Sequence, residues 1–152
     1  MKHIEESLSQ VGNLVLEEWA MMMVDAAPKA LSIFELDAPF YVSTATFTGV
    51  FCGEITVVCQ SPFLDCLTRN LLSMSSEEAL DEPMKQDSLR ELANLVSGNF
   101  LVETYGPETT FELPRFASRM ADRKEIEALK PDASICCAGD GFPVLMGCTI
   151  HG

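Results

Sequence analysis

The pattern of hydrophobic and polar positions over residues 84–105 predicts one long helix with two different faces. At about 100° per residue, one side collects an apolar stripe that would face a core: Leu89, Leu92, Ala93, Val96 and Phe100. The opposite side collects a second set, which we call the polar stripe: Asp87, Glu91, Asn94 and Gly98. Lys85 and Arg90 are expected beside this stripe rather than in it.

The polar stripe is the candidate functional site of the chain. Glu91 and Asn94 are three positions apart, so their side chains are neighbours on a helix surface. Gly98 costs about 1 kcal/mol of helix propensity relative to alanine, and it would let a partner approach the backbone. The alternative is an ordinary solvated helix face, because Glu-x-x-Asn alone is a short and common pattern.

The first half of the chain reads as helix, strands and helix. A helix is predicted over residues 3–25 from apolar residues at helical spacing: Ile4, Leu8, Val11, Leu14, Val15, Trp19 and Met22. A short strand is predicted at 31–36, and a hairpin at 41–50 and 54–59. Ser61 as N-cap and Pro62 predict a helix that ends near Leu72, followed by an acidic linker at 73–81.

The second half continues with further strands. A short strand at 109–113 is predicted to end at Pro114, and residues 117–129 are predicted to be a weakly helical surface insertion. Residues 132–150 predict a hairpin with its turn at 139–141. Phe34-Glu35-Leu36 and Phe111-Glu112-Leu113 suggest a pseudo-repeat, although the first helix has no Glu-x-x-Asn pair. We therefore expect one α/β (α+β) domain over residues 1–152, with a sheet against two long helices.

Composition excludes several classes of function. With 23 Asp and Glu against 10 Lys and Arg, the net charge of −13 argues against binding to nucleic acid or to an anionic membrane surface. The N-terminus has no apolar run suited to a signal peptide, and no apolar stretch reaches the roughly 18 residues that a membrane span needs. We expect a cytoplasmic protein with no membrane insertion.

The cysteines and histidines limit the chemistry further. The six cysteines include no Cys-x-x-Cys pair, so we expect reduced, mostly buried thiols and no metal site. His3 and His151 are the only histidines, and both lie at the ends of the chain. Catalysis by a histidine base is therefore not expected, and carboxylates and amides remain as the candidate groups.

These residues resemble a known family. A pattern Asp/Ser-x-x-x-Glu-x-x-Asn on a long helix, here Asp87, Glu91 and Asn94 with Gly98 after them, is similar to the phosphatase motif of the CheC/CheX/FliY family of bacterial chemotaxis proteins. The resemblance extends to the architecture of nearly the whole chain, and the single copy of the motif is similar to CheX. The family pattern also has a proline at the position of Ala117, whereas the nearest proline here is Pro114.

The resemblance implies a function. Proteins of this family dephosphorylate a CheY-like receiver domain, which holds Mg²⁺ beside its aspartyl phosphate, so the phosphatase needs no cofactor of its own. By the resemblance, Asn94 orients the attacking water and Glu91 pairs with a lysine of the receiver. Asp87 would position the interface, and Gly98 would also lie against the partner. The family further suggests a homodimer through sheet edges, for which the uncharged strand at 41–50 is the candidate.

Two other readings remain open. The chain could be a catalytically silent interaction or dimerisation module of the same fold, which docks to a receiver or a flagellar component. The distinguishing feature is whether Glu91 and Asn94 are exposed in a shallow groove beside the first helix or are covered by neighbours. A small-molecule-binding domain would need an enclosed apolar pocket, which the sequence does not indicate.

Overall fold

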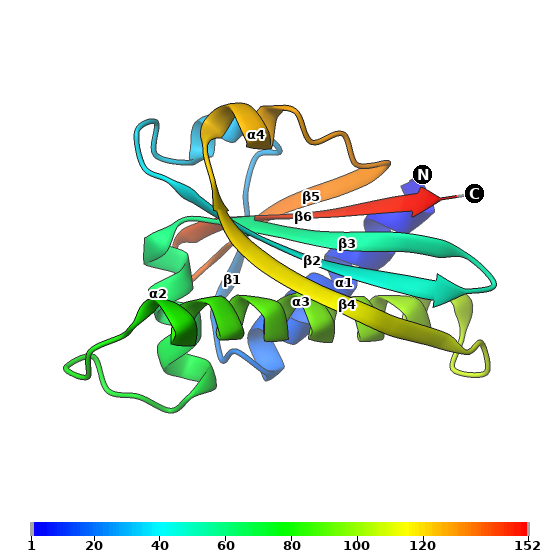
Figure 1. The fold of residues 1–152 in the computed structure, drawn as a ribbon, viewed down its shortest axis with the longest axis horizontal. Coiled ribbons are helices and arrows are strands. Elements are labelled where there is room, and N and C mark those ends of the chain that lie inside the picture. Colours follow the sequence, from blue (N-terminus) through cyan, green and yellow to red (C-terminus); the bar gives the residue numbers. More distant parts are fainter. Residues whose placement is uncertain (1, 152) are drawn as a thin grey trace.

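A computed structural model describes residues 2–151, which form a six-stranded antiparallel sheet with long helices on one face (Figure 1). The strand order is β1-β5-β6-β3-β2-β4. The strands are β1 (Val24–Ala26), β2 (Phe40–Gly49), β3 (Cys52–Cys59), β4 (Phe111–Ala121), β5 (Ala133–Gly139) and β6 (Phe142–His151). The helices are α1 (Lys2–Glu18), the 3-10 turn η1 (Leu31–Ile33), α2 (Ser61–Leu71), α3 (Glu82–Tyr105) and α4 (Arg123–Glu127). The expected α/β class, with a sheet against two long helices, is confirmed.

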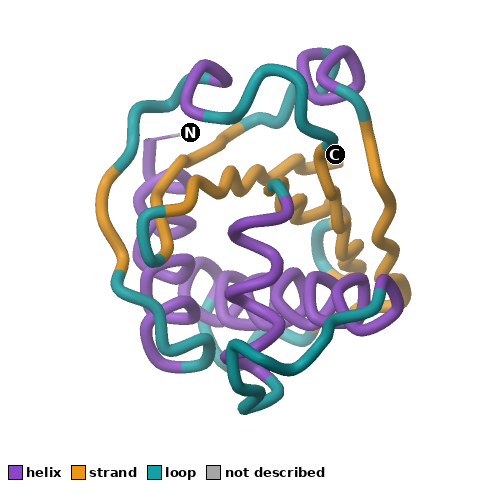
Figure 2. The backbone as a smooth tube through the Cα atoms, turned by 90° about the vertical axis from the view of Figure 1, so that its left-hand side faces the viewer, coloured by secondary structure: helices purple, strands orange, loops and turns teal. Residues whose placement is uncertain are grey.

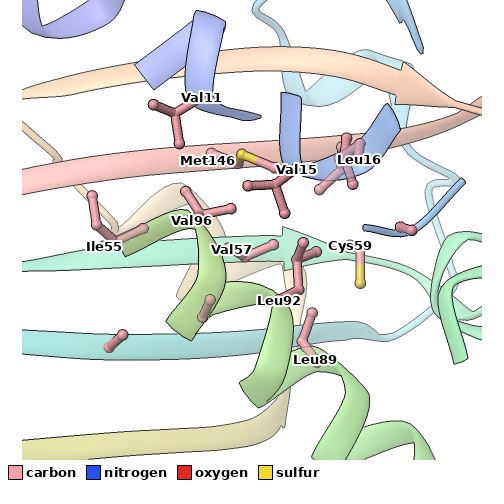
Figure 3. Close-up of a cluster of buried hydrophobic side chains, with 14 of the residues drawn as sticks. Val11, Val15, Leu16, Ile55, Val57, Cys59, Leu89, Leu92, Val96 and Met146 are labelled. Atoms are coloured by element: carbon pink, nitrogen blue, oxygen red, sulfur yellow. The ribbon is translucent and has the colours of Figure 1, made fainter. Parts of the chain in front are cut away.

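The sheet lies between the longer helices on one side and the short helical turns η1 and α4 on the other (Figure 2). Inward-facing side chains of α1, α3 and the central strands form the main core, part of which is drawn in Figure 3: Val11, Val15, Leu16, Ile55, Val57, Leu89, Leu92, Val96 and Met146. A smaller cluster on the opposite face includes Phe34, Phe40 and Ile126. Burial on both faces makes the sheet a rigid support for α3.

Helix α3 begins at Glu82, slightly before the predicted start at residue 84, and ends at Tyr105 as predicted. The Asp81 side chain accepts a hydrogen bond from the Met84 amide at 2.9 Å, and Pro83 occupies the first turn. Gly106, with φ of 88°, ends the helix. The apolar stripe predicted for this helix is buried in the core, so the orientation predicted for the two faces is confirmed.

Both predicted hairpins are present. Strands β2 and β3 pair from Tyr41 opposite Cys59 to Phe47 opposite Gly53. Strands β5 and β6 are joined by the two residues Asp140 and Gly141, with φ of 50° and 86°. Positive φ at both positions is the geometry of a type I′ turn, which matches the twist of the strands it connects.

The first helix is shorter than predicted. It ends at Glu18 rather than near residue 25, because the Met22 amide donates back to the Leu16 carbonyl at 2.9 Å and Met21 takes a φ of 51°. The chain then continues as β1, which pairs with β5. Trp19 consequently lies beyond the helix and is exposed instead of buried.

The strand predicted at residues 31–36 is absent, which also removes the proposed match between the two Phe-Glu-Leu tripeptides. The segment is the turn η1 followed by a loop. The Gln60 side chain takes the place of a neighbouring strand: it accepts from the Glu35 amide at 2.9 Å and donates to the Glu35 carbonyl at 2.8 Å. The N-cap of α2 is likewise Gln60, with Ser61 as the first helical residue.

Strand β4 is the largest departure from the prediction. It runs through Pro114 to Ala121, so the first part of the predicted insertion at 117–129 belongs to the sheet, and the rest contains α4. Proline is tolerated because β4 is an edge strand that pairs only with β2, and the register shifts beside it, between Thr46 and Thr48. Strand β2 is therefore internal, and the expectation that residues 41–50 form a free edge is wrong. The sheet edges are β1 and β4.

Lys85 is buried rather than placed at the side of the helix. Its ammonium lies 3.0 Å from an Asp65 carboxylate oxygen on α2 and 5.1 Å above the Tyr41 ring. Burial lowers the pKa of Lys85, but the hydrogen bond and charge of Asp65 outweigh this effect, so the pKa is raised overall. The Tyr41 hydroxyl donates to Glu82 at 3.0 Å. These contacts attach the first turn of α3 to α2 and β2.

Within residues 2–151, no helix combines the length and apolar character that crossing a bilayer requires.

Candidate functional site

The polar stripe of α3 lies on the helix side away from the core. Asp87 and Glu91 are exposed, and Asn94 and Gly98 are half-buried. A Cβ atom built on Gly98 would meet no other atom within 4 Å, so the helix backbone is open at this position. The four residues are thus on one accessible surface, as the helical spacing predicted.

A groove of about 310 Å³ runs between α3 and the edge strand β4, and we call it the polar groove. It is lined by Asp87, Arg90, Glu91, Asn94 and Phe116. The sequence leads us to expect Asn94 in a groove beside the first helix. The groove that Asn94 lines is instead on the β4 side of α3. Figure 1 shows β4 running along this side of α3.

Arg90 joins the two walls of the polar groove. It forms an ion pair with Asp87 one turn earlier, and its other terminal nitrogen donates to the Ser118 hydroxyl of β4 at 3.0 Å. Ser118 in turn donates to the Gln86 carbonyl at 3.3 Å. The Asp87 carboxylate is consequently engaged with Arg90.

Glu91 and Asn94 differ from Asp87 in this respect. Among residues 2–151, no side-chain hydrogen bond or ion pair holds either of them. The Asn94 amide therefore has both a free acceptor oxygen and a free donor nitrogen, and the Glu91 carboxylate is free to accept from a cation. This pair of neighbouring, unengaged groups is suited to holding a water and a partner's ammonium or phosphoryl group.

A second groove, of about 440 Å³, lies on the other side of the same two carboxylates, and we call it the apolar groove. Its lining combines the end of α2, the first turns of α3 and the residue after α1: Trp19, Leu71, Leu72, Met84, Asp87, Ser88, Glu91 and Leu95. Asp87 and Glu91 line both grooves and form the ridge between them.

Three of the thiols are poor candidates for catalysis because their pKa values are raised. Burial raises the pKa of Cys137 and of Cys148 to about 12, and burial with a hydrogen bond to Asp140 raises the pKa of Cys66 to about 11. A thiol with a raised pKa is protonated at neutral pH and is a weak nucleophile. Across residues 2–151, no group of three or more histidine, cysteine or carboxylate side chains is arranged to hold a metal ion.

Sequence reasoning missed three residues that shape the site. Arg90 had a signal, because it is three residues after Asp87 and four before Asn94 and so is their neighbour on the helix. Phe116 had none, since its segment was not predicted to be a strand. Trp19 was assigned to a buried helical stripe, and only the early end of α1 exposes it.

Solved structures share this fold over almost the full chain. The CheX–CheY–BeF3–Mg²⁺ complex from Borrelia burgdorferi aligns with a TM-score of 0.68 at 15% identity, covering 97% of this chain and 97% of that one. CheX from Desulfovibrio desulfuricans aligns with a TM-score of 0.72 at 13% identity, covering 97% and 99%. Thermotoga maritima FliY aligns with a TM-score of 0.55 at 13% identity, covering 96% and 89%.

The sequence itself carries the family assignment. No curated protein sequence matches this chain. The family described as Chemotaxis phosphatase CheX matches residues 41–137, which include the hairpin β2–β3, all of α3 and the edge strand β4. This range contains every residue of the polar groove. The chain belongs to the CheX family of chemotaxis phosphatases.

Proposed function

We propose that this protein hydrolyses the aspartyl phosphate of a CheY-like receiver domain, using Asn94 and Glu91. The observation that carries the proposal is that these two side chains are adjacent on α3, line one groove and are engaged by no other described group. Family membership and the Borrelia burgdorferi complex of CheX with CheY, BeF3 and Mg²⁺ support the same partner.

The proposed chemistry needs orientation rather than a nucleophile from this chain. An aspartyl phosphate is a mixed anhydride, which water can hydrolyse: the water oxygen bonds to phosphorus, the phosphorus–oxygen bond to the carboxylate breaks, and inorganic phosphate leaves. The Asn94 amide oxygen accepts a hydrogen bond from the water while its NH₂ donates to a phosphoryl oxygen. Fixing the water in this geometry replaces a bimolecular encounter with a positioned attack.

Glu91 supplies docking in the proposal. Its free carboxylate pairs with the lysine of the receiver's active site, and a charge-assisted hydrogen bond sets the orientation in which Asn94 reaches the phosphoryl group. Mg²⁺ belongs to the receiver, where it neutralises the charge of the phosphoryl oxygens. The ion pair with Arg90 makes Asp87 a group that shapes the groove, and Gly98 leaves room for the partner's surface.

The silent interaction module remains the second candidate. It would use the same surface and would leave the phosphate intact. The active protein is favoured because Glu91 is exposed, Asn94 is half-buried, and both line an open groove. A homodimer and a cytoplasmic location stay predictions, and any pairing of sheets between copies would have to use β1 or β4.

The test is the decay of a Mg²⁺-bound phosphorylated receiver with the wild-type protein and with Asn94→Ala. We expect the variant to lose at least about 100-fold of the accelerated rate, since it removes the group that orients the water. The matched control is Asn99→Ala on the same helix, whose amide donates to the Leu95 carbonyl at 2.7 Å and lies outside the polar groove.

The outcomes separate the candidates. Acceleration that is lost in Asn94→Ala and retained in Asn99→Ala establishes both the activity and the residue. Acceleration that survives in Asn94→Ala assigns the chemistry elsewhere. Binding of the receiver without any faster decay supports the silent module instead.

A further inference from the structure

Exposed apolar side chains gather where α1 and α2 end. Trp19 is 55% exposed, Leu72 is 49% exposed, and Met21, two residues after Trp19, is 66% exposed. Trp19 and Leu72 line the apolar groove together with Leu71 of α2 and with Met84 and Leu95 of α3. Large side chains of this kind are normally buried, so an apolar hollow that retains them marks an interaction surface.

The apolar groove is preformed by hydrogen bonds in its walls. The Asn70 side chain of α2 donates to the Ala20 carbonyl at 2.8 Å, which fixes the residue after Trp19 against α2. The Leu72 amide donates to the Thr68 carbonyl at 3.0 Å, and the Met84 amide is capped by Asp81. A surface held in this way loses little conformational freedom when a partner binds.

Charge defines what the apolar groove accepts. One wall carries the carboxylates of Asp87 and Glu91, and no lysine or arginine side chain is among its lining residues. Glu91 is free of any ion pair within the described chain, so the groove presents apolar surface beside an unmatched negative charge. Its complement is an apolar side chain next to a lysine or arginine.

We propose that the apolar groove around Trp19 is the part of the receiver-docking surface that determines affinity. This inference rests on the proposed function, and it deepens it: the receiver inserts an exposed apolar side chain between Trp19 and Leu72, while a basic neighbour meets Glu91. Because Glu91 forms the ridge shared with the polar groove, a receiver seated over Asn94 also covers the apolar groove. Trp19 then governs binding, and Asn94 governs turnover.

A second copy of this chain is a poor occupant. The net charge is −13, and the segment that leads from α2 into the first residue of α3 adds further exposed carboxylates: Glu77, Glu78, Asp81 and Glu82. Two copies meeting at this surface would bring like charges together, which is costly at an interface. A partner with a basic rim has no such penalty.

Trp19 provides a direct probe because it is the only tryptophan of the chain. The experiment titrates the protein with a receiver loaded with BeF3 and Mg²⁺, after replacing any receiver tryptophan by phenylalanine. We expect a saturable blue shift of the Trp19 emission and reduced quenching by acrylamide, as an exposed indole becomes covered. The protein alone should show no such change over the same range of concentration.

The companion variants are Trp19→Ala and the control Phe142→Ala. Phe142 is also an exposed aromatic residue, but it lies in a separate groove with Gln60 and Pro62. For Trp19→Ala we expect the KM for phosphorylated receiver and the Kd for loaded receiver, measured by calorimetry, to rise at least about tenfold, with kcat within about twofold of wild type. Phe142→Ala should change neither constant. Leu72→Ser, at another lining residue of the apolar groove, should repeat the effect of Trp19→Ala.

Two results would overturn the proposed docking surface, and a third would support it while rejecting the proposed activity. Unchanged Trp19 emission at saturating loaded receiver places docking elsewhere, while the proposed phosphatase function can still stand. A blue shift produced by the protein alone on raising its concentration makes a second copy the occupant. A receiver-induced blue shift without faster phosphate decay supports the docking surface and rejects the proposed activity, so the two failures are distinguishable.

Discussion

The two sides of α3 differ although they share one ridge. The polar groove on the β4 side holds Arg90, Asn94 and Phe116, whereas the apolar groove on the α2 side is formed mainly by apolar side chains around Trp19. Glu91 belongs to both. The difference indicates that the two sides of the helix have separate roles. One side performs the proposed chemistry, and the other provides the proposed binding affinity for the receiver.

The division has a simple geometric origin. Successive residues of a helix are turned by about 100°, so Asn94 faces β4 while Leu95 faces α2. The wall opposite Asn94 is an edge strand with exposed side chains, and the wall opposite Leu95 consists of helix ends with apolar side chains. The same helix is therefore flanked by an edge strand on one side and by apolar helix ends on the other.

After Asn94→Ala, the largest effect that tests this comparison is expected for Glu91→Ala, because the ridge residue serves both grooves. We expect kcat/KM to fall about 10- to 100-fold, mostly through KM, and the salt dependence of receiver binding to weaken as one charge contact is lost. Steady-state dephosphorylation at several salt concentrations measures both effects. Glu103→Ala, an exposed carboxylate further along α3, is the control and should change little.

If Glu91→Ala lowers kcat alone and leaves KM and its salt dependence unchanged, Glu91 acts only in the chemistry. Glu91 would then contribute nothing to receiver binding, and the proposal that it serves both grooves would be wrong.

A smaller effect is expected for Arg90→Gln, because Arg90 lines the polar groove and not the apolar groove. The variant loses the ion pair with Asp87 and the hydrogen bond to Ser118, so the free energy of unfolding should fall by about 1 kcal/mol. Turnover should slow several-fold while the Trp19 emission shift with loaded receiver is retained. Urea unfolding and single-turnover decay provide the two measurements.

Ser118→Ala is the matched variant for Arg90→Gln. It removes the hydrogen bonds of the Ser118 hydroxyl with Arg90 and the Gln86 carbonyl but keeps the Arg90 charge and its pairing with Asp87. Equal loss of stability with normal turnover in Ser118→Ala would assign the kinetic effect of Arg90→Gln to the charge. Equal kinetic effects in both variants would mean that the attachment of β4 is what the reaction requires.

The smallest effect is expected for Gly98→Ala, which lies at the far end of the polar stripe. Alanine meets no atom within 4 Å there and improves helix propensity, so the variant should be more stable by up to about 1 kcal/mol. If the partner approaches the backbone at this point, the KM should rise despite the gain in stability. Thermal unfolding and steady-state kinetics provide the two measurements. An unchanged KM would mean that Gly98 is not part of the partner surface.

Local sequence signals predicted those helices and hairpins whose main contacts join residues close to each other in the sequence. The two faces of α3 follow from spacing within one helix, and Asp81 and Gly106 set its ends. The hairpins β2–β3 and β5–β6 follow from alternating residues, and in β5–β6 the turn residues Asp140 and Gly141 take positive φ. In each case the decisive interactions lie within a few residues or across one hairpin, so a pattern in the chain is sufficient to predict them.

Long-range contacts decided the remainder. Pro114 lies inside β4 because that strand is at an edge, and strand order is a property of the whole sheet. Lys85 is buried because two residues distant in sequence stabilise its charge: Asp65 forms an ion pair with it, and the Tyr41 ring lies below its ammonium.

The sequence by itself determined that α3 carries Asp87, Glu91 and Asn94 on a face away from the core, since helical spacing is a local property. Only the tertiary structure decided what lies beside that face. Trp19 is exposed by the early end of α1, and Phe116 is delivered by an edge strand. The grooves are made from segments that meet only on folding, and no local pattern encodes such a meeting.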